Sequence, residues 1–98
     1  MITEIAQIDV KAGSEADFEA AVAKARDAFR RSEGFDGFEL HRSIEKTQRY
    51  RLVAKWRTLE AHTVTFRESE NFTAWRALVS PYFASPPEVE HTQIVVTT

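Results

Sequence analysis

The amino-acid sequence predicts an α+β fold with the ferredoxin-like order β-α-β-β-α(α)-β, in which helices cover one face of a four-stranded antiparallel sheet. Two observations predict it. Segments with alternating apolar residues, typical of strands, occur near both ends and in the middle of the chain. Segments with apolar residues every three or four positions, typical of helices, lie between them. The length of 98 residues suits one domain over residues 1–98.

The first strand and the long helix follow each other directly. Residues 2–10 alternate between apolar and polar positions, and Lys11–Gly13 supplies a turn. Ser14 is expected to cap a helix of about five turns, because its hydroxyl can accept a hydrogen bond from a backbone amide of the first turn. Gly34 is expected to end this helix in a left-handed conformation. One apolar stripe runs along it, formed by Phe18, Val22, Ala25 and Phe29.

A β-hairpin is predicted next. Residues 35–44 and 49–57 show strand alternation, and the connection at residues 45–48 is short and polar. A final strand is predicted over residues 89–96, which end in the apolar run Ile94-Val95-Val96.

Two shorter helices are predicted between the hairpin and the last strand. Thr58 is placed to cap a helix that extends to about Phe66. Ser69 is placed to cap a second helix that extends to about Val79, and Pro81 marks the point where that helix has ended.

Apolar residues appear on both faces of the predicted strands. Ile5 lies on the face opposite Ile8, and Val95 lies on the face opposite its two apolar neighbours. A sheet face without helices would then expose a large apolar patch. We therefore expect a homodimer through sheet-to-sheet packing.

Composition excludes several classes of function. The net charge is −2, and no basic face is visible, so no nucleic-acid partner is expected. The chain has no cysteine, which removes thiolate nucleophiles and thiolate metal sites. Because there is neither a signal peptide nor an apolar run of membrane-spanning length, no membrane association is expected and a cytoplasmic location is predicted.

Residues 56–83 are the most informative stretch for function. They hold more than half of the aromatic residues and one histidine, His62. Such a stretch predicts the wall of an apolar pocket for a small aromatic substrate, although aromatic residues at helical spacing also form ordinary cores. The candidate substrate-binding residues are Trp56, Phe66, Phe72, Trp75, Arg76 and Tyr82.

His62 is the candidate catalytic residue. It lies four positions before Phe66, so the two share a helix face, and an imidazole there could act as general base on a phenol. The alternative is a core histidine that hydrogen-bonds Glu60 or a strand carbonyl. His41 and His91 are expected to form hydrogen bonds at the sheet-to-sheet interface, and no spacing resembles a dedicated metal motif.

Several motifs in order resemble the antibiotic biosynthesis monooxygenase (ABM) family of dimeric α+β barrels. They are the opening strand with Lys11–Ser14 after it, the segment Gly34–Ser43, the strand that ends in Trp56 with Thr58–His62 following, and the helix Phe72–Val79. The resemblance covers nearly the whole chain and implies the same sheet and dimer.

The resemblance implies several different functions, because members of the family differ in activity. Some members oxidise phenolic or quinol-like aromatics with O2 and without metal, flavin or other cofactor, which is the reaction expected here. Their histidine usually lies nearer the position of Thr65. A haem-degrading branch carries Asn and His where this chain has Ala6 and Trp75, so haem degradation is disfavoured. The alternative is a ligand-binding or structural dimer without catalysis.

Overall fold

A computed structural model describes every residue from 1 to 98. The strands are β1 (Ile2–Asp9), β2 (Phe35–Arg42), β3 (Arg49–Trp56) and β4 (Glu88–Thr92). The helices are α1 (Glu15–Lys24), α2 (Arg26–Arg30), the π-helix η1 (Ala61–Phe66), α3 (Glu70–Val79) and the short 3-10 helix η2 (Ser80–Tyr82). None of these helices combines the length and the apolar character that crossing a bilayer requires.

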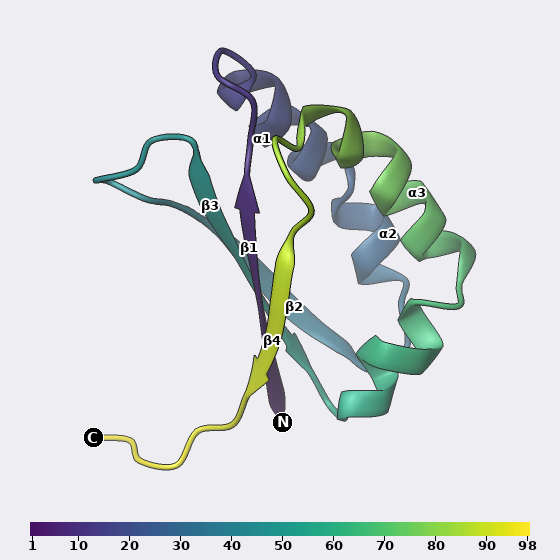
Figure 1. Cartoon of the computed structure of the whole chain (residues 1–98). Helices are drawn as coiled ribbons and strands as arrows, with labels where there is room; N and C mark the ends of the chain where they lie inside the picture. The colour runs from purple at the N-terminus through teal and green to yellow at the C-terminus, as the bar shows by residue number, and fades with distance from the viewer.

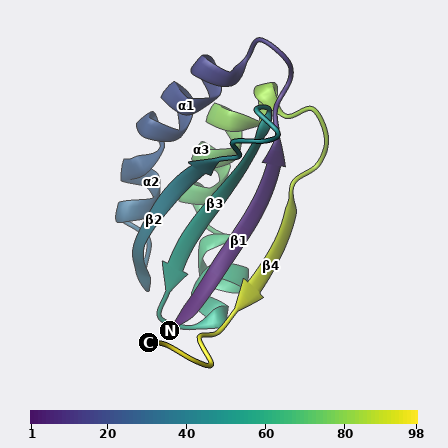
Figure 2. The same cartoon turned by 90° about the vertical axis from the view of Figure 1, so that its left-hand side faces the viewer.

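The four strands form one antiparallel sheet in the order β2-β3-β1-β4. All of the helices lie on one side of it (Figure 1). The other side of the sheet is uncovered, as the view turned by 90° shows (Figure 2). The predicted α+β, ferredoxin-like architecture is therefore confirmed.

The register of the two central strands explains the core. β1 and β3 pair from Ile2 opposite Trp56 to Asp9 opposite Arg49. Since paired residues point to the same face, the alternation places one set of β1 side chains and one set of β3 side chains together against the helices. The buried members of these two sets are Glu4, Ala6, Ile8, Tyr50, Leu52, Ala54 and Trp56.

The long predicted helix is divided at Ala25. The Ala25 amide donates to the carbonyls of both Ala21 and Val22, so the helix tightens locally before α2 begins. The apolar stripe is nevertheless buried as predicted. Ser14 precedes α1, but its side chain makes no capping hydrogen bond, so the predicted hydroxyl cap is wrong.

The two shorter helices begin where their caps predict. Thr58 Oγ1 accepts a hydrogen bond of 3.1 Å from the Ala61 amide. Ser69 Oγ accepts one of 3.3 Å from the Phe72 amide. The first of these helices is a π-helix, and the carbonyl of His62 accepts from the amide of Arg67, five residues on. π-Turns of this kind are rare and occur frequently at functional sites.

Gly34 is required at the entry to β2. Its φ angle is +79°, and a Cβ atom there would lie 2.7 Å from the Cβ of Ala61. A side chain at this position would be strained in its backbone and would also push η1 away from the sheet.

The last strand is shorter than predicted. Thr92 of β4 pairs with Thr3, close to the beginning of β1, so the chain beyond it has almost no partner strand left. The run from Ile94 to Val96 is consequently not part of the sheet and is largely exposed.

The uncovered sheet face is more polar than predicted. Ile5 and Val53 lie opposite each other and are partly buried, but charged residues surround them. Arg49 and Asp9 form a cross-strand ion pair of 2.9 Å on this face. The expectation of a large continuous apolar patch is therefore wrong for the single chain.

Candidate functional site

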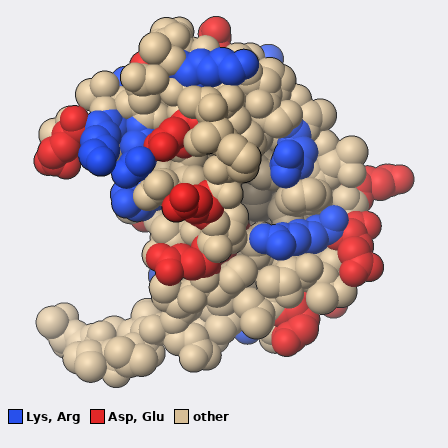
Figure 3. Space-filling model, in the orientation of Figure 1, with Lys and Arg blue, Asp and Glu red and all other residues tan.

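A cavity of about 270 Å³ lies between the sheet and the helices. Its volume is near the lower end of the range of small-molecule pockets, about 300–1,000 Å³. In the space-filling view, the surface is hollowed between these two layers, and basic side chains border the helical side of the hollow (Figure 3). Most of the lining is apolar, and the sheet contributes Ala6, Ile8, Leu52 and Val89, while aromatic walls come from Phe29, Phe66, Phe72, Trp75 and Phe83.

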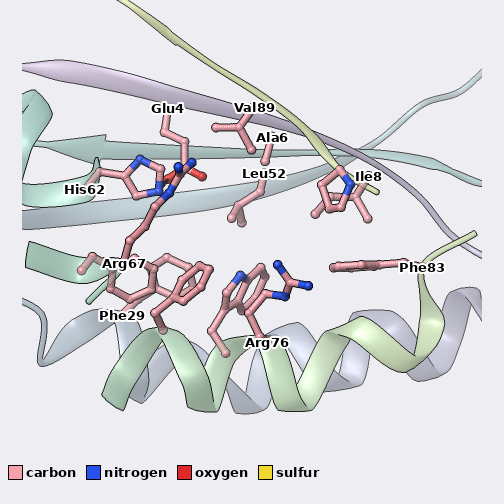
Figure 4. Close-up of a pocket in the computed structure, with 14 residues that line it drawn as sticks. Glu4, Ala6, Ile8, Phe29, Leu52, His62, Arg67, Arg76, Phe83 and Val89 are labelled. Atoms are coloured by element: carbon pink, nitrogen blue, oxygen red, sulfur yellow. Dashed lines mark ion pairs between the residues drawn. The ribbon is translucent and has the colours of Figure 1, made fainter. Parts of the chain in front are cut away.

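Most of the predicted site residues line this cavity. They are His62, Phe66, Phe72, Trp75 and Arg76 (Figure 4). Two predicted substrate-binding residues do not line it. Trp56 is fully buried beneath it, stacked against His62 with ring centroids 5.1 Å apart. Tyr82 lies in η2, packed against the core outside the lining.

The polar centre of the cavity is Glu4, which is not among the residues predicted from the sequence. This side chain is 5% exposed and points from β1 toward the helices. Its Oε1 atom accepts a hydrogen bond of 3.0 Å from Trp56 Nε1 and lies 3.3 Å from His62 Nε2. Oε2 has no hydrogen-bond partner. Every fully buried side-chain oxygen in the protein has such a partner, so Oε2 is not fully buried and is open to the cavity that Glu4 lines.

His62 is held at both ring nitrogens. Besides the contact with Glu4, its Nδ1 atom lies 2.8 Å from Nε2 of His91 on β4. The partner of His62 is therefore neither Glu60 nor a strand carbonyl. His91 pairs with Glu4 in the sheet and shares its helix-facing side, so the placement of His91 at a sheet-to-sheet interface is wrong. His41 does lie on the uncovered face, where it contacts Glu39 at 3.0 Å.

The surroundings push the pKa values of Glu4 and His62 in opposite directions. Burial raises the pKa of Glu4 from 4.5 to about 7, although the hydrogen bond from Trp56 and the charge of Arg67 partly oppose this. Burial lowers the pKa of His62 from 6.5 to about 4, with smaller contributions from Arg67 and His91. At neutral pH His62 is thus uncharged, and Glu4 is the group that can gain or lose a proton.

Two arginines add positive charge to the cavity. Arg67 follows η1 and extends toward Glu4 and His62, while Arg76 comes from α3 (Figure 4). The guanidinium of Arg76 also lies 5.9 Å from the centre of the Phe72 ring. A ligand oxygen that carries negative charge would be stabilised between them.

The sequence contains a signal for Glu4. In residues 2–10, Glu4 occupies the same face as Ala6 and Ile8, which is the face that becomes buried. A carboxyl on the apolar face of a strand is costly to bury, and such positions are often functional. For Arg67 and His91 no comparable pattern existed, because their inward orientation depends on the π-helix and on pairing with β1.

Comparisons with known proteins assign the family. The family model for antibiotic biosynthesis monooxygenases matches residues 1–78. YczJ of Bacillus subtilis is 36% identical over 95 residues, which cover 97% of this chain and the whole of YczJ. The fold, the aromatic cavity and these matches agree, and the chain belongs to the ABM family.

Two solved structures extend the comparison. A Bordetella bronchiseptica protein named for the same family is 55% identical, with a TM-score of 0.95 over 97% of each chain. SnoaB of Streptomyces nogalater, described as a cofactor-independent oxygenase, is 23% identical, with a TM-score of 0.83 over 98% of this chain and 94% of SnoaB. The second likeness shows a shared fold.

Proposed function

We propose that this protein is a cofactor-independent monooxygenase that oxidises a small phenolic or quinol-like aromatic with O2. The observation that carries the proposal is the open Oε2 atom of Glu4 inside an aromatic cavity. Apolar walls suit a planar ring, and a carboxyl whose pKa is about 7 suits the removal of a phenolic or benzylic proton. The family supports the same class of reaction, as does the cofactor-independent oxygenase SnoaB.

In this mechanism Glu4 takes the role that the sequence assigned to His62. Both nitrogens of His62 are engaged, and its low pKa makes it a weak base. His62 instead holds the carboxyl in place, together with Trp56. Phe66, Phe72 and Trp75 pack against the substrate ring, and Arg76 and Arg67 stabilise the developing oxyanion.

The reaction balances without an external reductant. Glu4 removes a proton, and the electron-rich anion passes one electron to O2. The resulting radical and superoxide combine at carbon to give a peroxide, which takes up a proton. Loss of the remaining hydrogen on that carbon, with cleavage of the O–O bond, gives a carbonyl and water. One oxygen atom enters the product and the other leaves as water, and the substrate supplies all four electrons.

Haem degradation has no comparable support. Ala6 and Trp75, where haem-degrading relatives carry Asn and His, both line the cavity. Neither side chain is a ligand for haem iron.

The test is oxygen uptake with anthrones, naphthohydroquinones and simple quinols, with metal and with chelator. Glu4→Gln keeps the size of the side chain and an acceptor for Trp56 but removes the base. We expect it to lose about 10²-fold or more in kcat, while His41→Gln on the other face keeps wild-type activity. Equal uptake by wild type and Glu4→Gln would reject the mechanism. Ligand binding without uptake would instead indicate a non-catalytic binding protein.

We also propose that the protein is a homodimer that packs the uncovered sheet faces together. The face is self-complementary in charge, since β4 presents Glu88 and Glu90 while β3 presents Arg49, Arg51 and Lys55. A two-fold axis beside the Ile5–Val53 pair would cover these two side chains.

Light scattering during gel filtration tests the dimer. Wild type is expected at twice the chain mass, and Ile5→Asp at the chain mass, because a carboxylate at the centre of the interface would be buried unpaired. Thr98→Asp, at the end of the chain, serves as the control. A monomeric wild type would reject the dimer.

A further inference from the structure

Three titratable side chains form a continuous line from the cavity to the surface. Glu4 comes from β1, His62 from η1 and His91 from β4. Glu4 Oε1 lies 3.3 Å from His62 Nε2, and His62 Nδ1 lies 2.8 Å from His91 Nε2. Glu4 and His62 are buried, whereas His91 is partly exposed. Only Glu4 and His62 have a place in the mechanism above.

The two contacts of His62 use opposite nitrogens of the same ring. The side chains therefore do not converge on a common point, as the ligands of a metal ion would. An imidazole with such neighbours on both sides can accept a proton at one nitrogen and release another proton from the second. The arrangement suits the transfer of a proton from one side chain to the next rather than the binding of a metal ion.

We propose that Glu4, His62 and His91 form a proton relay between the cavity and solvent, in which His91 is the exit residue. The relay is a property of the free protein. Its use during turnover rests on the proposed function, in which Glu4 takes up the substrate proton.

The protons of the relay occupy different atoms in its two states. When Glu4 is protonated, it donates to His62 Nε2, and His62 Nδ1–H donates to His91 Nε2. The proton of Glu4 then moves to His62 Nε2, the Nδ1 proton moves to His91 Nε2, and His91 releases its own Nδ1 proton to water. Glu4 is left ionised, and His91 and His62 now donate toward it. One proton has left, and both histidines are neutral again.

Burial and the neighbouring positive charge favour transfer through the histidines over retention on them. Burial, then the charge of Arg67, lowers the pKa of His91, and the same two causes lead for His62. The other groups that face the relay are Trp56 on β3, which donates to Glu4, and Arg76 on α3. Neither can accept a proton, so among the side chains that face the relay only His91 can carry a proton from His62 toward solvent.

The first test uses the free protein and needs no substrate. The ring ¹⁵N signals of the histidines are followed by NMR from about pH 4.5 to 9, together with the side-chain carboxyl ¹³C signal of Glu4. We expect His62 to change from the Nδ1–H to the Nε2–H tautomer at the midpoint of the Glu4 titration. In Glu4→Gln that change is expected to vanish, and His41 is the internal control. A single His62 tautomer across the Glu4 titration would overturn the relay.

The second test uses turnover of 1,8-dihydroxyanthrone with His91→Gln, which retains a polar side chain but cannot pass a proton on. We expect kcat to fall about tenfold, less than for loss of the base itself, with KM unchanged and with partial recovery in imidazole buffer. His41→Gln is the matched control. Wild-type kcat in His91→Gln, beside an inactive Glu4→Gln, would overturn the relay but leave the proposed function intact. If wild type consumes no O2, the proposed function fails and the NMR titration alone decides the relay.

Discussion

The indole of Trp56 and the carboxyl of Glu4 are joined by a hydrogen bond of 3.0 Å, although 52 positions separate them in the chain. Both residues lie on the central strands of the sheet. The bond explains why Trp56 is not a wall of the cavity: its ring is used to hold the acid that faces the cavity. A residue that the sequence assigned to substrate contact thus has a positioning role.

Replacing Trp56 by Phe should destabilise the protein more at pH 8 than at pH 5. The change keeps an aromatic ring but removes the donor to Glu4, and that donor matters most when the carboxyl is ionised. We expect a loss of about 1–3 kcal/mol at pH 8 for a buried charged acceptor left without its partner. Urea unfolding at both pH values measures it, and an equal loss at the two would contradict the role of the bond.

The dependence of stability on pH should reveal two opposing titrations. The raised pKa of Glu4 means that the folded protein holds a proton between about pH 4.5 and 7 that the unfolded chain has lost, so Glu4 lowers stability as pH rises. The lowered pKa of His62 means that the unfolded chain binds a proton between about pH 4 and 6.5 that the folded protein does not. His62 therefore raises stability over that window, and the two effects largely cancel in the wild type.

Glu4→Gln should expose the contribution of His62. Its stability is expected to rise by up to about 3 kcal/mol from pH 4 to 6.5, since one pKa unit corresponds to about 1.4 kcal/mol, and to stay level above that. The variant should also exceed wild type in stability at pH 8, because no charge is buried. Urea midpoints at successive pH values provide the measurement, with His41→Asn as the control. Parallel curves for wild type and Glu4→Gln would contradict the raised pKa.

Gly34→Ala should destabilise the protein more than Gly13→Ala, because it adds a steric clash to backbone strain. Both glycines have positive φ, but only at Gly34 would a Cβ meet another side chain, that of Ala61. We expect Gly13→Ala to cost about 1 kcal/mol and Gly34→Ala clearly more. Because Ala61 precedes His62, Gly34→Ala should also reduce turnover. Equal losses of unfolding free energy in the two variants would argue against the contact.

Ser69→Ala should destabilise the protein more than Ser14→Ala does. Ser69 caps α3 through its hydroxyl, whereas the hydroxyl of Ser14 caps nothing. Loss of the first is expected to cost about 1 kcal/mol, and loss of the second a few tenths or less. Thermal unfolding of both variants beside wild type is sufficient, and a cost for Ser14→Ala as large as that for Ser69→Ala would be unexpected.

Local patterns predicted the architecture well, because strand alternation and helix spacing reflect burial directly. The stripe that includes Phe18 and Phe29, and the cap at Ser69, are examples. Features that depend on pairing between distant segments were not predictable in the same way. β4 stops at Thr92 because β1 begins at Ile2, and His91 faces inward because its partner is Glu4.

The candidate site was predicted in part for the same reason. The aromatic side chains follow from the spacing of α3, and five of the predicted residues line the cavity. The acid at its centre required a different inference, namely that a charged residue on a buried strand face needs partners from elsewhere in the chain. Those partners, Trp56 and His62, come from segments more than fifty residues away.

His91 lies on a strand that unfolds locally more easily than the strand that carries Glu4. Glu4 and Trp56 lie on strands with neighbours on both sides, whereas His91 lies on a five-residue strand hydrogen-bonded only to β1. Edge strands open by local unfolding at lower free energy than central ones. Amide hydrogen exchange should therefore be faster in β4 than in β1. In the proposed relay, each such opening separates His91 from His62, so proton release through the two histidines alternates between intervals of fast and slow exchange.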